Sequence, residues 1–298
     1  MIKPDYYDDF KCIAGACQHN CCIGWEIDID SVSLQKYQNA DGEVKRSLQK
    51  NIALEPCAHF VLTEEERCPY LNGDNLCELI LYGGEEMLCQ ICSEHPRFYN
   101  TIDDVTEVGL GLCCEAAAKL ILTKTEPLKL IAEDGAPVKN AFFQERAAIF
   151  AILQNRKMPL TERIAAALAK ANVASPIGKA DWIAVYKELE RLDVTWERYL
   201  NALTCVREDI PAGMDVVFEQ LLCYFVYRHL IGCKDDFLFG ERLQFSVLSC
   251  YMIASLVQSP ADVFEIARMY SAEIEYSDEN VSVLLDTLQE CNERQTIR

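Results

Sequence analysis

Residues 12–22 read CIAGACQHNCC and hold four cysteines in eleven positions, with the spacing C-x4-C-x3-C-C. A packed core does not require such a density of thiols. Zinc and iron–sulfur centres do, because they bind to thiolates that are held close together. The stretch therefore predicts a metal site, and the cysteines that follow it extend the same pattern.

Further cysteines follow at short spacings. Eight residues separate Cys68 from Cys77, two separate Cys89 from Cys92, and Cys113 comes later. Short spacings bring ligands together with little loss of chain entropy, and the C-x2-C turn is common in zinc and iron–sulfur sites. Nine clustered cysteines exceed one tetrahedral site and roughly fit two sites of four ligands. The predicted ligands are Cys12, Cys17, Cys21, Cys22, Cys68, Cys77, Cys89, Cys92 and Cys113.

The charge of the chain restricts its partners and its compartment. The 298 residues carry a formal net charge of -19, which disfavours nucleic acid and anionic membranes, because both attract clustered lysine and arginine. Residues 1–9 lack the basic segment and apolar run of a signal peptide, and no window reaches eighteen apolar residues. We therefore expect a cytoplasmic protein with no nucleic-acid or membrane partner, whose sixteen cysteines form no disulfide framework.

The cysteines also divide the chain. Eleven of them precede residue 115. The other five lie singly, mostly in apolar helical patterns, and are expected to be small buried hydrophobic residues: Cys205, Cys223, Cys233, Cys250 and Cys291. A polar connection punctuated by proline and glycine covers residues 123–137. We predict a cysteine-rich metal or iron–sulfur cluster domain at residues 1–122 and an α-helical domain at residues 123–298.

The predicted fold class is mainly α, with the cysteine-rich N-terminal region packed on a C-terminal helical bundle. Hydrophobic periodicity predicts helices at about 141–155, 160–171, 180–191, 195–207, 214–232, 241–258, 260–274 and 278–293. Shorter helices are expected after a cap at Asp30 or Ser31, at 85–92 and at 114–122. Few strands are expected.

The spacing leaves the type of metal site open. Zinc and an iron–sulfur cluster both fit the spacing. The role of the site is open as well: it fits a purely structural zinc domain, and it fits a metal storage, sensing or assembly protein. The C-x3-C-x2-C pattern of radical S-adenosylmethionine enzymes is not met, because Gly24 stands where the third cysteine would be. No glycine-rich turn follows a strand, so the sequence predicts no Rossmann-like nucleotide site.

Seven motifs occur in the order found in one known family. They are Phe10–Cys12, Cys21–Asp30, Arg67–Leu71, Leu76–Leu79, Leu88–Cys92, His95–Phe98 and Gly111–Ala117. Together they resemble the flagellin lysine-N-methylase family, which belongs to a broader group with a CxxCxxCC-type cysteine cluster that chelates zinc or iron. In the last motif Cys113 takes the position of the family's cysteine, and Cys114 takes the position of a proline.

The resemblance implies a protein-lysine N-methyltransferase that acts on flagellin. It also implies a metal or iron–sulfur site, for which a 4Fe-4S cluster is preferred over zinc, and S-adenosylmethionine as the methyl donor. Methylation of an amine requires a neutral lysine, so an acidic or tyrosine pocket near the site would help to bind and deprotonate it. The candidates for that pocket are Tyr6, Tyr7, Glu26, Asp28, Asp30 and Glu94.

Overall fold

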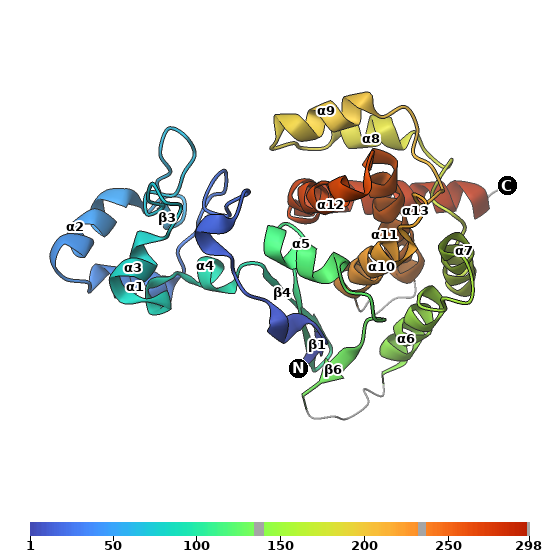
Figure 1. The fold of residues 1–298 in the computed structure, drawn as a ribbon, viewed down its shortest axis with the longest axis horizontal. Helices are drawn as coiled ribbons and strands as arrows, with labels where there is room; N and C mark the ends of the chain where they lie inside the picture. The colour runs from blue at the N-terminus through green and yellow to red at the C-terminus, as the bar shows by residue number, and fades with distance from the viewer. Residues whose placement is uncertain (134–139, 232–236, 297–298) are drawn as a thin grey trace. The chain divides into compact units, whose positions relative to one another are not determined.

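The computed structural model describes residues 1–133, 140–231 and 237–296. The chain forms two compact units (Figure 1). Unit 1 contains residues 1–10, 99–113 and 117–298, and unit 2 contains residues 11–98 and 114–116. These two units differ from the predicted domains, which have their boundary after residue 122. That boundary stays a prediction about functional regions.

Unit 1 is built mainly from helices, as the sequence predicts. They are α5 (Glu115–Leu122, of which 117–122 belong to this unit), α6 (Ala141–Leu153), α7 (Leu160–Lys170), α8 (Trp182–Glu188), α9 (Val194–Ala202), α10 (Asp215–His229), α11 (Phe237–Leu256), α12 (Val263–Tyr270) and α13 (Asp278–Thr296). A π-helical segment, Ser271–Glu275, follows α12 directly. Within the described residues, the predicted bundle is therefore confirmed element by element.

The core of unit 1 lies around α10, which packs on α11. Most of α10 is buried on every side, including Phe218, Leu222 and Phe225. A helix that is apolar all round belongs in the interior of a bundle. In Figure 1, α6, α7, α12 and α13 surround this pair.

A four-stranded sheet in unit 1 was not predicted. Its order is β4-β5-β1-β6, from strands β1 (Ile2–Pro4), β4 (Arg97–Ile102, of which 99–102 belong to this unit), β5 (Val105–Leu110) and β6 (Leu130–Ala132). In the central strand, Ile2 pairs with Glu107 in parallel register and with Ala132 in antiparallel register. The phenol of Tyr227 on α10 lies 3.1 Å from the carbonyl of Ile2 and 3.0 Å from that of Val108, so it ties the bundle to the sheet.

Buried ion pairs complete the interior of unit 1. Glu219 has no exposed side-chain area and binds both Arg156 and Arg163. Glu107 on β5 pairs with Arg146 on α6, and both side chains are almost completely buried. Buried charges are found in proteins when they are paired in this way.

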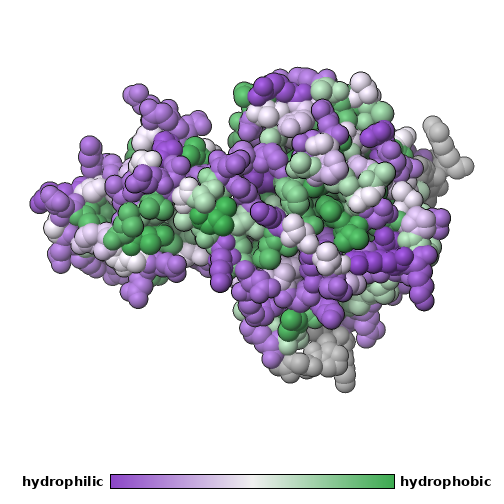
Figure 2. Space-filling view, viewed as in Figure 1, coloured by the Kyte–Doolittle hydropathy of each residue, from purple (hydrophilic) through white to green (hydrophobic). Residues whose placement is uncertain are grey.

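Unit 2 is small and rich in loops. Its elements are the 3-10 turn Ala14–Ala16, α1 (Ser31–Gln38), α2 (Gly42–Asn51), the strands β2 (Ile52–Ala53) and β3 (His59–Phe60), α3 (Glu78–Gly83), the 3-10 turn Glu85–Met87 and α4 (Gln90–Glu94). The predicted helix at 85–92 is thus split in two, because Leu88 and Cys89 are extended. On the face of this unit that Figure 2 shows, most residues are hydrophilic, and hydrophobic ones gather over α3.

The isolated cysteines of the C-terminal region match their prediction in three cases. Cys223, Cys250 and Cys291 are buried, as expected for small hydrophobic residues. Cys205 is exposed, so its prediction was wrong. Cys233 and the predicted connection from residue 134 to residue 137 lie outside the described residues.

Candidate metal centre

Five of the predicted ligands meet in the core of unit 2. Cys68 and Cys89 are buried in its hydrophobic cluster, and Cys22, Cys77 and Cys92 pack against the same cluster. They come from four separate parts of unit 2, so the fold, and not a local motif, brings them together. The same cluster contains the large apolar side chains of Tyr37, Leu48 and Phe60.

Backbone contacts bring these segments together. The N–H of Cys68 donates to the carbonyl of Cys22 at 2.8 Å, and Leu71 forms a β-bridge with Cys77. Gly24 has a φ of 73°, and its N–H donates to the carbonyl of Glu66. This left-handed conformation favours glycine, which explains the glycine at the position where a radical S-adenosylmethionine pattern has a cysteine.

The thiols influence one another's ionisation. The hydrogen bond between the thiols of Cys89 and Cys92 lowers the pKa of Cys89 to about 7, and the same contact, with burial, raises the pKa of Cys92. Their sulfur atoms are 3.5 Å apart. A hydrogen bond between the adjacent thiols likewise lowers the pKa of Cys21 and raises that of Cys22.

The third part of the group is Cys68. Burial raises its pKa to about 11, and charge on the neighbouring thiols Cys77, Cys89 and Cys21 acts in the same direction. Cys22 also interacts with Cys68 and Cys77. Six thiols therefore form one electrostatically connected group, called the cysteine group below: Cys21, Cys22, Cys68, Cys77, Cys89 and Cys92.

The cysteine group has the donor chemistry of a soft-metal site. Within residues 1–133, 140–231 and 237–296, no three His, Cys, Asp or Glu side chains stand in the arrangement of a preformed metal site. The thiols meet as close pairs and neighbours. Sulfur is nevertheless the preferred ligand of zinc and iron–sulfur clusters. The thiolate is the form that binds metal, and contacts within the group favour this form at Cys21 and Cys89.

The other three predicted ligands lie elsewhere. Cys12 is exposed and accepts a hydrogen bond from the N–H of Ala14. The Cys17 thiol donates to the carbonyl of His19 and contacts Glu115 Oε2 at 3.5 Å, and burial and this carboxylate raise its pKa to about 12. Cys113 is a buried residue of unit 1.

Glu115 is a polar partner that sequence reasoning missed. Its carboxylate also accepts from the N–H of Gln18 at 2.8 Å, so it fixes the segment that contains Cys17. The only sequence signal was its place in the Gly111–Ala117 motif, next to two cysteines.

The segment before Cys89 is held by α1. Lys36 Nζ donates to the carbonyls of Glu86 and Leu88 at 2.5 and 3.2 Å, and the Tyr37 hydroxyl donates to the carbonyl of Met87 at 2.7 Å. These bonds position Cys89 from its N-terminal side.

Asp30 holds the segment on the other side of Cys89. Its carboxylate accepts from the N–H of Ser33 at 2.9 Å, capping α1, and from the N–H of Gln90 at 2.8 Å. Desolvation opposes ionisation here, but these hydrogen bonds outweigh it and lower the pKa of Asp30 to about 2. The carboxylate therefore acts as a structural anchor, which does not suit it to accept a proton from lysine.

The remaining candidates for a lysine pocket are dispersed. Tyr6 is buried in unit 1 and Tyr7 is half-buried there. Burial raises the pKa of Tyr6 well above its usual value. In unit 2, Asp28 and Glu26 are exposed, and Asp28 accepts from the Cys57 thiol. Glu94 accepts from the side chain of Gln90.

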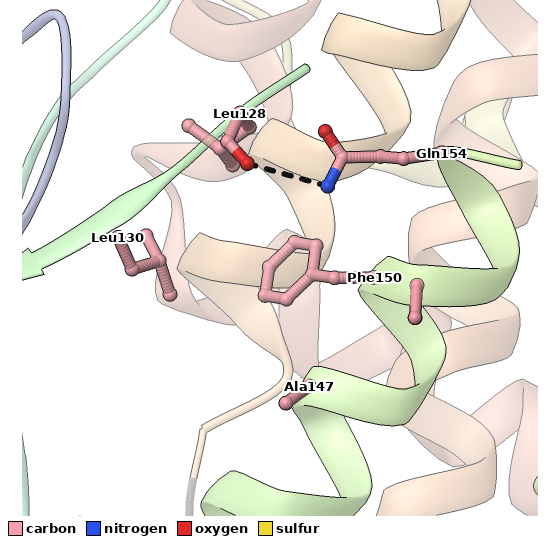
Figure 3. Close-up of a pocket in the computed structure, with 6 residues that line it drawn as sticks. Leu128, Leu130, Ala147, Phe150 and Gln154 are labelled. Carbon is pink, nitrogen blue, oxygen red and sulfur yellow. Dashed lines mark hydrogen bonds between the residues drawn. The ribbon is translucent and has the colours of Figure 1, made fainter. Parts of the chain in front are cut away.

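A separate pocket of about 310 Å³ lies in unit 1, between α6 and the segment around β6. Its walls are apolar apart from Gln154 (Figure 3), whose Nε2 donates to the carbonyl of Leu128. The side chains of Leu130 and Phe150 lie on either side of the opening. The pocket contains no group suited to deprotonate an amine.

Comparison with known proteins supports the resemblance drawn from the motifs. Residues 173–298 match the FliB lysine N-methylase C-terminal domain. The chain is 29% identical over 137 residues to the flagellar biosynthetic protein FliU of Salmonella muenchen. The aligned region covers 44% of this chain and 81% of that protein. No solved structure matches the chain.

Two further relatives are named lysine-N-methylase. They come from Salmonella choleraesuis and Salmonella typhimurium, and each is 28% identical over 144 residues, covering 44% of this chain and 34% of the relative. The match thus spans about a third of the length of these two proteins. No described helix has the length and apolar character needed to cross a membrane. Residues 173–298 of the chain are therefore similar to the C-terminal domain of the FliB lysine N-methylases.

Proposed function

We propose that this protein is a lysine N-methyltransferase that acts on flagellin, uses S-adenosylmethionine as methyl donor and holds a 4Fe-4S cluster in unit 2. The proposal is carried by one combination: the match to a lysine N-methylase domain in a chain in which five of the nine predicted cysteine ligands gather in one core. The names of the relatives connect the family with flagella and with lysine methylation.

The cysteine group offers more than enough ligands for one cluster. A 4Fe-4S cluster binds four thiolates, and the group contains six thiols. Cys22, Cys68, Cys77, Cys89 and Cys92 are the candidates with a place in or against the core. When bound, such a cluster would supply a cross-link between the four segments and a centre that can exchange an electron.

The proposed reaction defines what the protein has to do. The neutral lysine Nζ attacks the sulfonium methyl carbon of S-adenosylmethionine, so that a C–N bond forms and the C–S bond breaks. S-adenosylhomocysteine leaves, and the nitrogen loses one proton to solvent or to a base. The protein must therefore orient the two substrates in line and hold the lysine where its charged form is disfavoured.

The direct test is methyl transfer under anaerobic conditions. Purified protein is incubated with recombinant Salmonella flagellin and S-adenosylmethionine that carries an isotopically labelled methyl group. We expect label on lysine side chains, located by mass spectrometry of flagellin peptides. A metal-loaded, folded protein that transfers no label would refute the enzymatic proposal.

The second candidate function is a non-enzymatic metal or iron–sulfur protein for sensing, storage or assembly. It is favoured by the cysteine group itself, since this group needs no methyl acceptor to bind metal. It predicts metal binding without methyl transfer in the same assay. Zinc in place of a cluster is the alternative occupant for both functions.

A further inference from the structure

Helix α3 presents an apolar surface to solvent. Only Leu79 is buried, whereas Ile80, Leu81 and Tyr82 have exposed fractions of 39%, 63% and 61%. We call these three exposed residues the α3 patch. Figure 2 shows hydrophobic side chains gathered over this helix. Grouped apolar side chains on an otherwise hydrophilic surface are typical of an interaction site.

The α3 patch is presented on a fixed frame. Gly84, with a φ of 79°, ends the helix, and the chain turns back through Glu85–Met87. The carbonyls of Glu86 and Met87 accept from Lys36 and Tyr37 on α1. The patch is therefore held in place from outside its own helix.

The surroundings of the patch carry negative charge. Glu78, Glu85 and Glu86 are all exposed, and no salt bridge involves them within the described part of the chain. Residues 11–98 contain 14 acidic and 7 basic residues, a formal charge of -7. An apolar patch bordered by carboxylates fits a partner that has apolar and cationic side chains on one face.

The patch also lies directly beside predicted metal ligands. The N–H of Leu81 donates to the carbonyl of Cys77 at 3.1 Å, so these residues are one helical turn apart, a rise of about 5–6 Å. On the other side, Cys89 follows Met87 by two residues. A partner seated on α3 would therefore contact the segment that joins two members of the cysteine group.

We propose that the α3 patch docks an amphipathic, lysine-bearing segment of the methyl-acceptor protein, an inference that rests on the proposed function. Leu81 and Tyr82 bury themselves in the apolar face of that segment. The carboxylates of Glu85 and Glu86 pair with its lysines. The surface thus selects cationic acceptors and brings them next to the cysteine group.

Binding can be tested without methyl donor. The probe is a fluorescent amphipathic peptide of leucine and lysine, and its control has glutamate in place of lysine. Anisotropy is measured on the full chain carrying Leu81→Ser and Tyr82→Ser. The matched control carries Leu54→Ser and Val61→Ser, two positions of unit 2 with exposed fractions of 61% and 47%.

We expect the patch variant to weaken peptide binding by about tenfold or more, as loss of central anchor residues does, and the matched control to bind as wild type. Reversal of charge by Glu85→Lys and Glu86→Lys weakens binding, and added salt weakens wild-type binding. Circular dichroism verifies that each variant is folded.

Three results would overturn the docking proposal. The first is equal binding of the lysine peptide by wild type and patch variant, and absence of binding by both counts as this result. The second is equal affinity of the wild type for the lysine peptide and for the acidic control peptide. The third is loss, on patch substitution, of a self-associated form or of binding to phosphatidylcholine–phosphatidylglycerol vesicles, because each would identify another occupant. A patch variant that still methylates flagellin normally would refute docking but not the methyltransferase, whereas binding without any methylation would refute only the methyltransferase.

Discussion

Asp30 should stabilise unit 2 more than any other helix cap there, because one carboxylate makes two structural bonds. Asp30→Ala removes the cap of Ser33 N–H and the bond from Gln90 N–H. Loss of an N-cap costs about 1 kcal/mol, and loss of a second charge-assisted hydrogen bond costs about another 1 kcal/mol. The expected decrease in the free energy of unfolding is about 2 kcal/mol.

The pKa of Asp30 gives an independent check. Its lowering from 3.8 to about 2 corresponds to about 2 kcal/mol at most, and solvent screening reduces this toward about 1 kcal/mol. Because the folded-state pKa is the lower one, this stabilisation is present above about pH 4 and is lost as the pH falls toward 2. Asp30→Asn should therefore show a weaker acid dependence of stability than wild type between these pH values.

The assay is urea unfolding followed by circular dichroism, with a matched aspartate as control. Asp41 occupies the cap position of α2, but its side chain makes no capping hydrogen bond. Asp41→Ala should thus change the free energy of unfolding by less than about 0.5 kcal/mol. Equal losses for the Asp30 and Asp41 variants would refute the assigned role of Asp30.

Three further predictions concern separate parts of the molecule. Cys89→Ser should remove most of the bound metal, measured by elemental analysis, whereas Cys57→Ser, at an exposed thiol, should leave the metal content unchanged; equal loss in both would contradict the proposed ligands. Burial lowers the pKa of His95 from 6.5 to about 4, so the unfolded chain binds a proton on this imidazole more tightly than the folded chain does. Metal-free protein should therefore lose stability as the pH falls from 6.5 to 4. His95→Gln should flatten that part of the stability curve, and an unchanged curve would contradict the assignment. Glu219→Ala leaves two arginines of unit 1 without their buried carboxylate and should lower the free energy of unfolding by about 3–5 kcal/mol in urea; a loss below about 1 kcal/mol would argue against this ion-pair network.

The helices of unit 1 could be predicted because their signals are local. Periodic apolar residues on α6, α7 and α13 give each helix an amphipathic or buried character that is visible within one window. The cap of α1 was predicted at Asp30 or Ser31, and the structure has it at Asp30, whose carboxylate satisfies a free N–H group of the first turn.

The sheet could not be predicted in the same way. Strand β1 has only three residues, ends in Pro4, and pairs with β5 and β6, which are more than a hundred residues away. Such pairing depends on the whole fold, and a three-residue segment shows no alternation of its own. The hairpin of β4 and β5 was missed because two acidic residues, Asp103 and Asp104, interrupt its apolar pattern.

The cysteine motifs indicated the type of site but not which thiols meet. Convergence depends on turns such as the one at Gly24 and on contacts such as Cys68 N–H with the Cys22 carbonyl. The spacing of the cysteines placed Cys17 and Cys113 in one predicted ligand set with the others. Their surroundings in the structure are a glutamate for Cys17 and the interior of unit 1 for Cys113.

The cysteine group is the centre of this account, and its occupant can be measured directly. The protein is purified without oxygen, its absorption spectrum is recorded, and its iron, acid-labile sulfide and zinc are quantified. We expect a brown protein with iron and sulfide in equal amounts, as in a 4Fe-4S cluster. A colourless protein with stoichiometric zinc would contradict the cluster, and a folded protein with neither metal would contradict a metal site in unit 2.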